Sequence, residues 1–308
     1  MVHHDEAFLP AADGHKIYTQ TWRPGSAAAG VIQVLHGLGE CSDRYARFAT
    51  AASERGMAVV AQDFRGCGRH ADTRGYFSAN HGWRKICDDV ELINAAVRRD
   101  FAGTPVIMLG HSLGSFVAQA FAMYWGARLD GLILSGSTWT NRALLIAAGL
   151  LAQAECWRTA PHGHSGVLDW LGFSRFNHKF RPARTPVDWL SRDEAEVDKY
   201  VADPLCGGPF TSGMWRDIAT GLREITSDAA LNRIPSDLPI LITGGGKDPV
   251  GGEAGMGSLA LHYAQTLHNR MTVRIYAEGR HELLNDVDRD AVTSNWLDWI
   301  AATTRSGR

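Results

Sequence analysis

The sequence predicts an α/β protein with a mostly parallel central sheet, helices on both faces of that sheet, and an inserted helical cap. Two observations support this prediction. Short apolar segments alternate with segments of helical periodicity along most of the 308 residues, and this alternation is interrupted once, over residues 139–226. Continuous apolar strands are typical of parallel sheets, because helices bury both faces of such a sheet.

The first half of the chain contains five apolar segments of strand length, with amphipathic segments between them. The expected strands are 16–22, 31–36, 57–64, 105–110 and 131–136. The expected helices are 43–56, 84–101 and 113–129. This order of strands and helices indicates crossover connections within one parallel sheet.

The alternation stops after residue 138. Residues 139–226 contain no convincing strand, several loops rich in Gly, Pro and His, and five of the ten tryptophans. Ser191 and Glu194 form a capping-box pattern that predicts a helix over 192–202. We therefore expect residues 1–138 and 227–308 to form the core and residues 139–226 to form a helical cap.

The alternation resumes in the last part of the chain. Strands are expected over 238–245 and 271–277, and helices over 257–269 and 286–304. These segments add two strands to the same sheet, so the cap is expected to be an insertion within one core.

Charge and cysteine content exclude several classes of protein. The 31 Lys and Arg residues nearly balance the 33 Asp and Glu residues, without a run of like charges, so no nucleic-acid partner is expected. The longest strongly apolar run, 143–154, is too short to span a bilayer. The N-terminus lacks a secretory signal, and no particular oligomeric state is indicated.

Five cysteines are scattered along the chain without paired Cys-x-x-Cys spacing, and they are Cys41, Cys67, Cys87, Cys156 and Cys206. An odd number with this spacing indicates reduced thiols rather than a disulfide framework or a zinc site. We expect a cytoplasmic protein, with peripheral contact to a membrane surface left open.

The segment 110–114, Gly-His-Ser-Leu-Gly, lies between an expected strand and an expected helix. The motif Gly-x-Ser-x-Gly in this context is typical of a nucleophile elbow, which holds Ser112 out for chemistry. Such a turn is tight and strained, so Gly110 and Gly114 are needed where side chains would collide with neighbouring strands. The alternative is an ordinary glycine-rich turn from strand to helix.

A serine nucleophile needs a base, and the base needs an orienting acid. Asp248 follows the strand 238–245, and His281 follows the strand 271–277. Both positions are at carboxyl ends of strands, where sites of wound sheets form. The order Ser112, Asp248, His281 is that of an α/β-hydrolase triad. His36 and His111 lie beside strand ends, where we expect structural hydrogen bonds.

The oxyanion of an acyl-transfer intermediate needs two backbone N–H donors. We assign one to Leu113, directly after the serine, and the other to Leu38 in the glycine-rich segment 36–40. The alternative for 36–40 is an ordinary exit from a strand. Cys67 lies between two glycines in the segment 63–69, but arginines flank it and no histidine is assigned to it, so we interpret it as a loop residue.

These motifs resemble the lysophospholipase/monoacylglycerol lipase branch of the α/β-hydrolases, also described as serine aminopeptidase S33-like hydrolases. The resemblance extends from about residue 8 to residue 302 and rests on the segments 36–45, 63–69, 110–114, 203–213, 244–252 and 279–286. It implies the same triad and the same two amides. Cys41 departs from the family, which often has His at this position. We expect Glu40 to brace the oxyanion loop.

The expected activity is hydrolysis of carboxylic esters with a single acyl chain, of the monoacylglycerol lipase, lysophospholipase or carboxylesterase type, without a metal or organic cofactor. Apolar cap residues favour an acyl substrate, and they are Trp139, Leu144, Leu145, Leu150, Leu151, Trp157, Trp170, Leu171 and Phe173. An exposed face on 142–156 would also dock on lipid aggregates.

The sequence is also consistent with two other functions. One is a serine peptidase of the aminopeptidase type, in which Glu155, Glu194 or Glu196 of the cap would hold the amino terminus of the substrate. The other is a non-catalytic ligand-binding protein built on the hydrolase fold.

Overall fold

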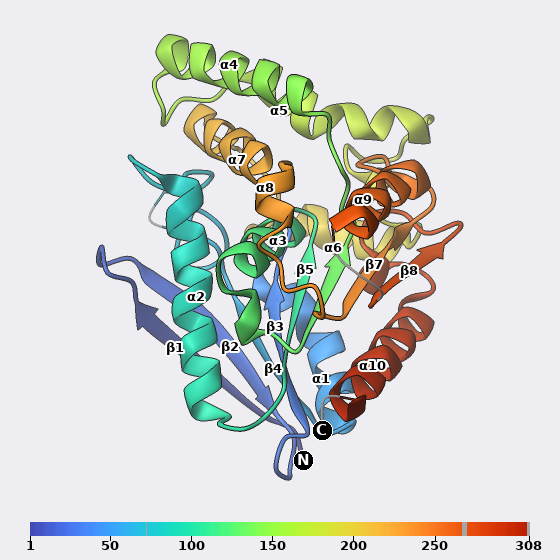
Figure 1. The fold of residues 1–308 in the computed structure, drawn as a ribbon. Coiled ribbons are helices and arrows are strands. Elements are labelled where there is room, and N and C mark those ends of the chain that lie inside the picture. Colours follow the sequence, from blue (N-terminus) through green and yellow to red (C-terminus); the bar gives the residue numbers. More distant parts are fainter. Residues whose placement is uncertain (72, 267–269, 307–308) are drawn as a thin grey trace.

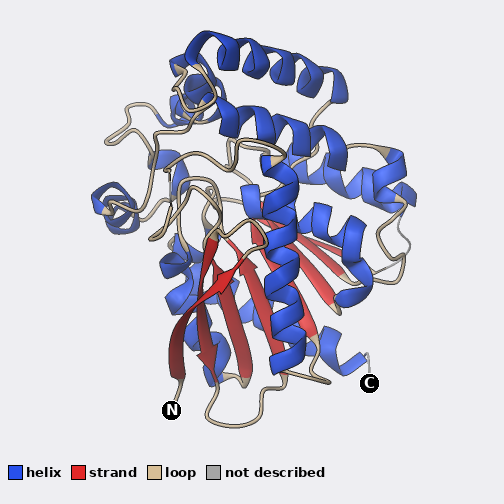
Figure 2. Ribbon diagram, turned by 90° about the vertical axis from the view of Figure 1, so that its left-hand side faces the viewer, coloured by secondary structure: helices blue, strands red, loops and turns tan. Residues whose placement is uncertain are grey.

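The computed structural model describes residues 1–71, 73–266 and 270–306. Its centre is an eight-stranded sheet with the strand order β1-β2-β4-β3-β5-β6-β7-β8 (Figures 1 and 2). The strands are β1 (His3–Pro10), β2 (Lys16–Arg23), β3 (Gly30–Leu35), β4 (Met57–Gln62), β5 (Val106–His111), β6 (Gly131–Ser135), β7 (Ile240–Gly245) and β8 (Met271–Tyr276). The pairs β1–β2 and β2–β4 are antiparallel, and the other neighbouring pairs are parallel. The predicted fold class is confirmed.

Strand β1 was not predicted from the sequence. Seven of its eight residues are exposed, so it lacks the apolar pattern that identifies the other strands. It pairs with β2 along its whole length and forms one edge of the sheet. Its backbone hydrogen bonds, rather than buried side chains, therefore hold it in place.

Helices cover both faces of the sheet, with α1 (Ala46–Glu54) and α10 (Arg289–Ser306) on one face and α2 (Gly82–Asp100), α3 (Leu113–Trp125) and α9 (Gly252–Thr266) on the other. Consecutive residues of β5 alternate between the two cores: Val106 and Met108 lie in one, and Ile107 and Leu109 lie in the other. This period of two requires apolar residues at every position of the strand, as the sequence has.

Five α-helices lie between β6 and β7 in the sequence: α4 (Arg142–Thr159), α5 (Gly166–Gly172), α6 (Glu194–Ala202), α7 (Ser212–Ile225) and α8 (Asp228–Leu231). Helices α4, α5 and α7 lie above the carboxyl ends of the strands in Figure 1. In the described part of the chain, no strand lies between β6 and β7. Helix α4 packs along α7. The division into a core and a cap over 139–226 stays a prediction.

Two details of the predicted elements differ from the structure. Helix α6 begins after Asp193, whose side chain accepts the N–H groups of Ala195 and Glu196, so the predicted capping box of Ser191 and Glu194 is wrong. The Ser191 hydroxyl instead donates to the carbonyl of Asn285. The last three positions of the expected helix 257–269 lie outside the described residues.

Across the ranges that the structure describes, no helix combines the length and the apolar character that crossing a bilayer requires.

Helix α3 approaches the carboxyl end of β3 very closely at Gly114. A Cβ atom on Gly114 would lie 2.1 Å from the carbonyl oxygen of Leu35, and one on Gly110 would lie 2.3 Å from the carbonyl oxygen of Gly114. These contacts are with backbone atoms, which cannot move aside as a flexible side chain can. The two glycines are therefore required by the turn between β5 and α3.

We expect Gly114→Ala to lower the free energy of unfolding by about 3 kcal/mol, the upper range for overpacking, because the new methyl group meets backbone. Gly257→Ala is the matched control, since Gly257 lies in helix α9 with open space around its Cβ position. The control should raise the free energy of unfolding by up to about 1 kcal/mol, the difference between Gly and Ala in a helix. Urea unfolding measures both, and equal effects would contradict the steric account.

Candidate active site

Ser112 occupies the turn that joins β5 to α3. Its backbone has φ 50° and ψ −118°, a conformation that non-glycine residues rarely adopt. The Ser112 N–H donates to the carbonyl of Ser135 at 2.9 Å, and the following helix begins at Leu113. A strained serine at the carboxyl end of a central strand is the geometry of a nucleophile elbow.

Asp248 and His281 come together from the loops after β7 and β8. The Nδ1 atom of His281 lies 2.8 Å from Oδ2 of Asp248, and both side chains are buried. The indole ring of Trp189 packs against the His281 ring, with 4.9 Å between centroids. The carboxylate fixes the ring orientation, so the other ring nitrogen is free for proton transfer.

Ser112 and His281 line the same cavity. Within the described residues, the Ser112 hydroxyl makes no hydrogen bond to the imidazole. Such contacts are often long in hydrolases without substrate and shorten when the substrate binds. The structure therefore brings all three predicted residues to one end of the sheet.

The pKa of His281 is set by two opposing effects. Burial of the ring lowers this pKa, but the charge and hydrogen bond of Asp248 outweigh burial, so the pKa is raised above its ordinary value. The ring thus takes up a proton more readily than an isolated imidazole would. This favours a group that accepts a proton from a neighbouring hydroxyl.

His111 lies closer to the site than its position in the sequence suggested. Its ring packs against that of His281, with 4.7 Å between centroids, and it lines the cavity. Burial first, and then the neighbouring charge on His281, lower the pKa of His111 to about 4. Because His111 is uncharged, no second positive charge lies beside the His281 ring when His281 becomes protonated. His36, by contrast, makes the expected structural bonds, accepting the N–H of Phe64 at 2.9 Å.

Glu40 holds the loop after β3, as the sequence predicted. Its Oε1 accepts the N–H of Gly37 and the hydroxyl of Tyr45, the latter at 2.9 Å. Burial alone would raise the pKa of Glu40, but His111 and Arg44 lower it, so the carboxyl is ionised. The ionised side chain fixes the loop that carries Leu38.

Arg44 joins this loop to the histidine loop. Its guanidinium pairs with Glu282, next to His281, and lies 3.4 Å from Oε2 of Glu40. All three side chains are buried. Arg44 belongs to the segment 36–45, on which the family resemblance rests, but nothing in the chain order indicated Glu282 as its partner. This ion cluster sets the relative position of the two loops.

Leu38 and Leu113, the two predicted oxyanion donors, both line the cavity. The Leu113 N–H is at the first position of α3, where helical N–H groups have no intrahelical partner. The Gly37 N–H is already taken by Glu40. Leu38 therefore remains a candidate donor from that loop.

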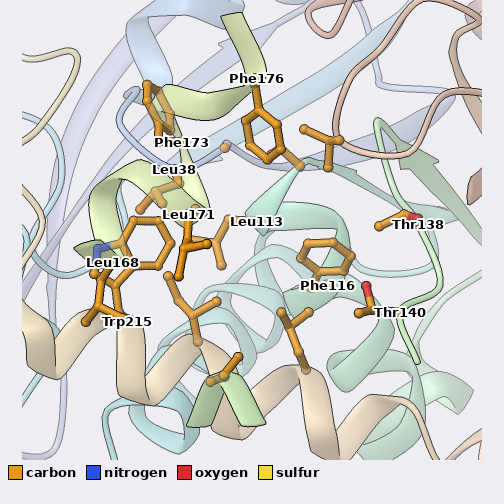
Figure 3. Close-up of a pocket in the computed structure, with 18 of the residues that line it drawn as sticks. Leu38, Leu113, Phe116, Thr138, Thr140, Leu168, Leu171, Phe173, Phe176 and Trp215 are labelled. Carbon is orange, nitrogen blue, oxygen red and sulfur yellow. The ribbon is translucent and has the colours of Figure 1, made fainter. Parts of the chain in front are cut away.

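The cavity has a volume of about 450 Å³ and a mainly apolar wall. Phe116 of α3, Trp215 of α7 and Phe173 and Phe176 of the segment after α5 surround it in Figure 3. Volumes of this size are typical of small-molecule sites. Its apolar wall suits a hydrocarbon chain rather than a polar substrate.

The cap residues predicted to contact an acyl chain divide into two groups. Five of them line the cavity: Leu144, Leu145, Leu151, Leu171 and Phe173. The other four, Trp139, Leu150, Trp157 and Trp170, are absent from its wall. Trp139 stacks on His262 at 4.0 Å, whereas Leu150, Trp157 and Trp170 are exposed on the surface.

The carboxylates considered for a peptidase are occupied elsewhere. Glu155 binds Arg158 and Ser165, Glu194 lies near Arg184 at the surface, and Glu196 pairs with Arg47 and Lys199. These three glutamates are absent from the cavity wall.

Cys67 lies in a loop, as predicted, and is buried. Burial and the charge of Asp63 raise the pKa of its thiol to about 12, so it is a poor nucleophile at neutral pH.

The family model described as "Serine aminopeptidase, S33" matches residues 26–288. The chain belongs to this family. The S33 match covers the β3 loop, the Ser112 turn and both triad loops, so the resemblance predicted from the motifs is confirmed. Membership makes the chain a hydrolase of the S33 type, as the sequence indicated.

Proteins similar to this chain carry lipase and esterase names. The chain is 25% identical to the monoacylglycerol lipase of Mycolicibacterium smegmatis, over 94% of both chains. It is 30% identical to human monoglyceride lipase over 65% of this chain and 60% of that protein. The crystal structure of a carboxyl esterase from Bacillus coagulans with glycerol superposes with a TM-score of 0.88 at 25% identity, covering 98% of this chain and 99% of that chain.

We expect the acid limb of the kcat/KM profile of this S33 hydrolase to have its midpoint above pH 6.5, the ordinary value for imidazole. The raised His281 pKa means that the neutral, active ring is lost as pH falls through that higher value. Asp248→Asn should lower kcat roughly 10⁴-fold and move the midpoint to lower pH. Removing the carboxylate leaves burial as the main influence on the ring.

Asp298→Asn is the matched control, because Asp298 lies exposed in α10 and outside the cavity wall. Its profile should overlay that of the unchanged protein. A midpoint that stays in place in Asp248→Asn would show that His281 is not the titrating group.

Proposed function

We propose that this protein is a serine hydrolase that cleaves carboxylic esters of a single acyl chain through an acyl-enzyme on Ser112. One observation carries the proposal: the strained Ser112 and His281, which is paired with Asp248, line an apolar cavity of about 450 Å³. The names of two relatives, monoacylglycerol lipase and monoglyceride lipase, support the ester class.

Acylation follows from the positions of these groups. The Ser112 oxygen attacks the ester carbonyl while His281 accepts the hydroxyl proton, and the carbonyl electron pair moves to the oxygen. The N–H groups of Leu38 and Leu113 hold that oxyanion. The tetrahedral intermediate then collapses, the bond to the alcohol breaks, and His281 gives its proton to the leaving alkoxide.

Deacylation repeats the same steps with water. His281 takes a proton from the water as its oxygen attacks the acyl-enzyme, and the second tetrahedral intermediate releases the acid. The proton returns from His281 to the Ser112 oxygen. Asp248 stabilises the imidazolium in both halves, and the buried, uncharged His111 adds no competing charge.

The cavity wall supports an acyl chain as the group that is bound. Burying hydrocarbon against leucine and phenylalanine side chains stabilises the complex by about 0.8 kcal/mol per methylene. A monoacylglycerol or lysophospholipid presents one such chain. The peptidase alternative has less support, because Glu155, Glu194 and Glu196 face other partners.

The exposed apolar residues of the cap support a second element of the proposal. Leu150 is 69% and Trp157 81% exposed on α4, and Trp170 is 49% exposed on α5. Exposed apolar residues on neighbouring helices are typical of surfaces that dock on lipid aggregates. Such docking brings a cytoplasmic enzyme into peripheral contact with a membrane, next to its lipid substrate.

Ser112→Ala should lower kcat on p-nitrophenyl fatty esters about 10⁶-fold, because the variant lacks the hydroxyl that attacks the ester carbonyl. A fluorophosphonate should label the unchanged protein once, at Ser112, as seen by mass spectrometry. Ser26→Ala, at an exposed position, should keep full activity and labelling.

The same assay separates the alternatives. Faster cleavage of aminoacyl p-nitroanilides than of fatty esters would favour the peptidase. Absence of labelling in the folded, unchanged protein would favour a non-catalytic binding protein.

Ala148→Phe should shorten the accepted acyl chain, because Ala148 of α4 lines the cavity and a phenyl ring would fill part of it. We expect kcat/KM for long-chain esters to fall at least about 10-fold, and that for short-chain esters to change by less than about 2-fold. Ala154→Phe on the same helix is the control, since Ala154 is exposed and lies outside the cavity wall. A uniform loss over all chain lengths would contradict an acyl site at this wall.

A further inference from the structure

Two thiols and a carboxylate meet where the cap touches the loop after β3. The ligand atoms of Cys41, Asp203 and Cys206 all lie within 4.8 Å of one another. Cys41 follows Glu40 in the loop that carries Leu38, whereas Asp203 and Cys206 belong to the turn after α6. The N–H of Gly207 donates to the carbonyl of Gly39 at 2.7 Å and holds the two segments together.

The spacing of these atoms suits a tetrahedral metal. The Sγ of Cys206 lies 3.5 Å from Oδ2 of Asp203. A zinc ion with metal–sulfur and metal–oxygen bonds of about 2.3 Å and 2.0 Å, at a tetrahedral angle, separates sulfur and oxygen by about 3.5 Å. Asp203 uses its other oxygen, Oδ1, to accept the Leu205 N–H at 2.8 Å, which orients the carboxylate.

We propose that Cys41, Asp203 and Cys206 form a binding site for a thiophilic divalent metal of the zinc class, distinct from the catalytic site. Thiolates and carboxylates are ligands that zinc prefers, and three protein ligands leave a fourth position for water. Asp203 and Cys206 are partly exposed, which gives the ion a path from solvent, while Cys41 is fully buried.

The charges of the site agree with a bound cation. Metal binding would release two thiol protons. Two thiolates, one carboxylate and one divalent cation leave a single negative charge on the site. The positive guanidinium of Arg44 interacts electrostatically with Cys206 and would partly offset that charge.

The cysteine spacing did not predict this site, because its ligands come from distant segments. The pair Asp203-x-x-Cys206 is a local chelate, but its third ligand is Cys41, which departs from the histidine common at this position in the family. A metal here would tie the turn after α6 to the oxyanion loop. The proposal does not depend on which substrate the enzyme cleaves.

The test is equilibrium binding of Zn²⁺ and Co²⁺ to the full reduced chain. Elemental analysis after dialysis should find one Zn²⁺ per chain, and Co²⁺ should produce a thiolate charge-transfer band in the near ultraviolet. The histidines near the N-terminus cannot produce that band. Cys206→Ser should abolish the band and weaken Zn²⁺ binding at least about 100-fold, more than loss of an outer partner costs.

Cys156→Ser is the matched control, because it removes a cap thiol outside the site and should leave metal binding unchanged. Zn²⁺ should also raise the melting temperature of the unchanged protein and of Cys156→Ser, but not that of Cys206→Ser. Circular dichroism checks that each variant is folded. Because Cys206 is partly exposed, its variant carries the test even if Cys41→Ser fails to fold. Absence of the cobalt band in the unchanged protein, or its persistence in Cys206→Ser, would overturn the proposal.

Discussion

The close approach of helix α3 to strand β3 is the constraint on which the site depends. The contact leaves no room for a side chain at Gly114 and forces Ser112 into a backbone conformation with positive φ. As a result, the Ser112 oxygen lies at the carboxyl end of the sheet, and the first backbone N–H groups of α3 point toward the same end. The unfavourable backbone energy of one residue is offset by the packing of a whole helix on the sheet.

A buried ion cluster fixes the relative position of two loops near that serine. Arg44 lies between Glu40, which holds the oxyanion loop, and Glu282, which follows the histidine. Burying three charges costs desolvation energy, so the cluster adds little to stability compared with apolar packing. Its contribution is geometric, because each of the two loops must place a glutamate against the same guanidinium of Arg44. For a hydrolase, the fixed position of the two loops matters more than added stability, since catalysis is sensitive to displacements of about 1 Å.

Most strands could be predicted, and so could the placement of Ser112, Asp248 and His281 at one end of the sheet, because parallel strands are apolar throughout and their carboxyl ends meet at one edge. Strand β1 could not, because an exposed edge strand has no apolar pattern. The start of α6 was missed since Ser191 and Asp193 both resemble N-caps, and only tertiary contacts decide between them. The place of His111 beside His281 depends on how the end of β5 and the loop after β8 converge, which local patterns do not encode.

The sheet separates the ends of the chain from the cavity. Strand β1 starts and helix α10 finishes at the amino ends of the parallel strands, whereas α4 and α5 cover the opposite end (Figure 1). A fusion partner or a surface linker attached before β1 or after α10 would emerge on the far side of the molecule. If the protein were immobilised through either attachment point, the end of the sheet that carries the cavity would face the solution instead of the support.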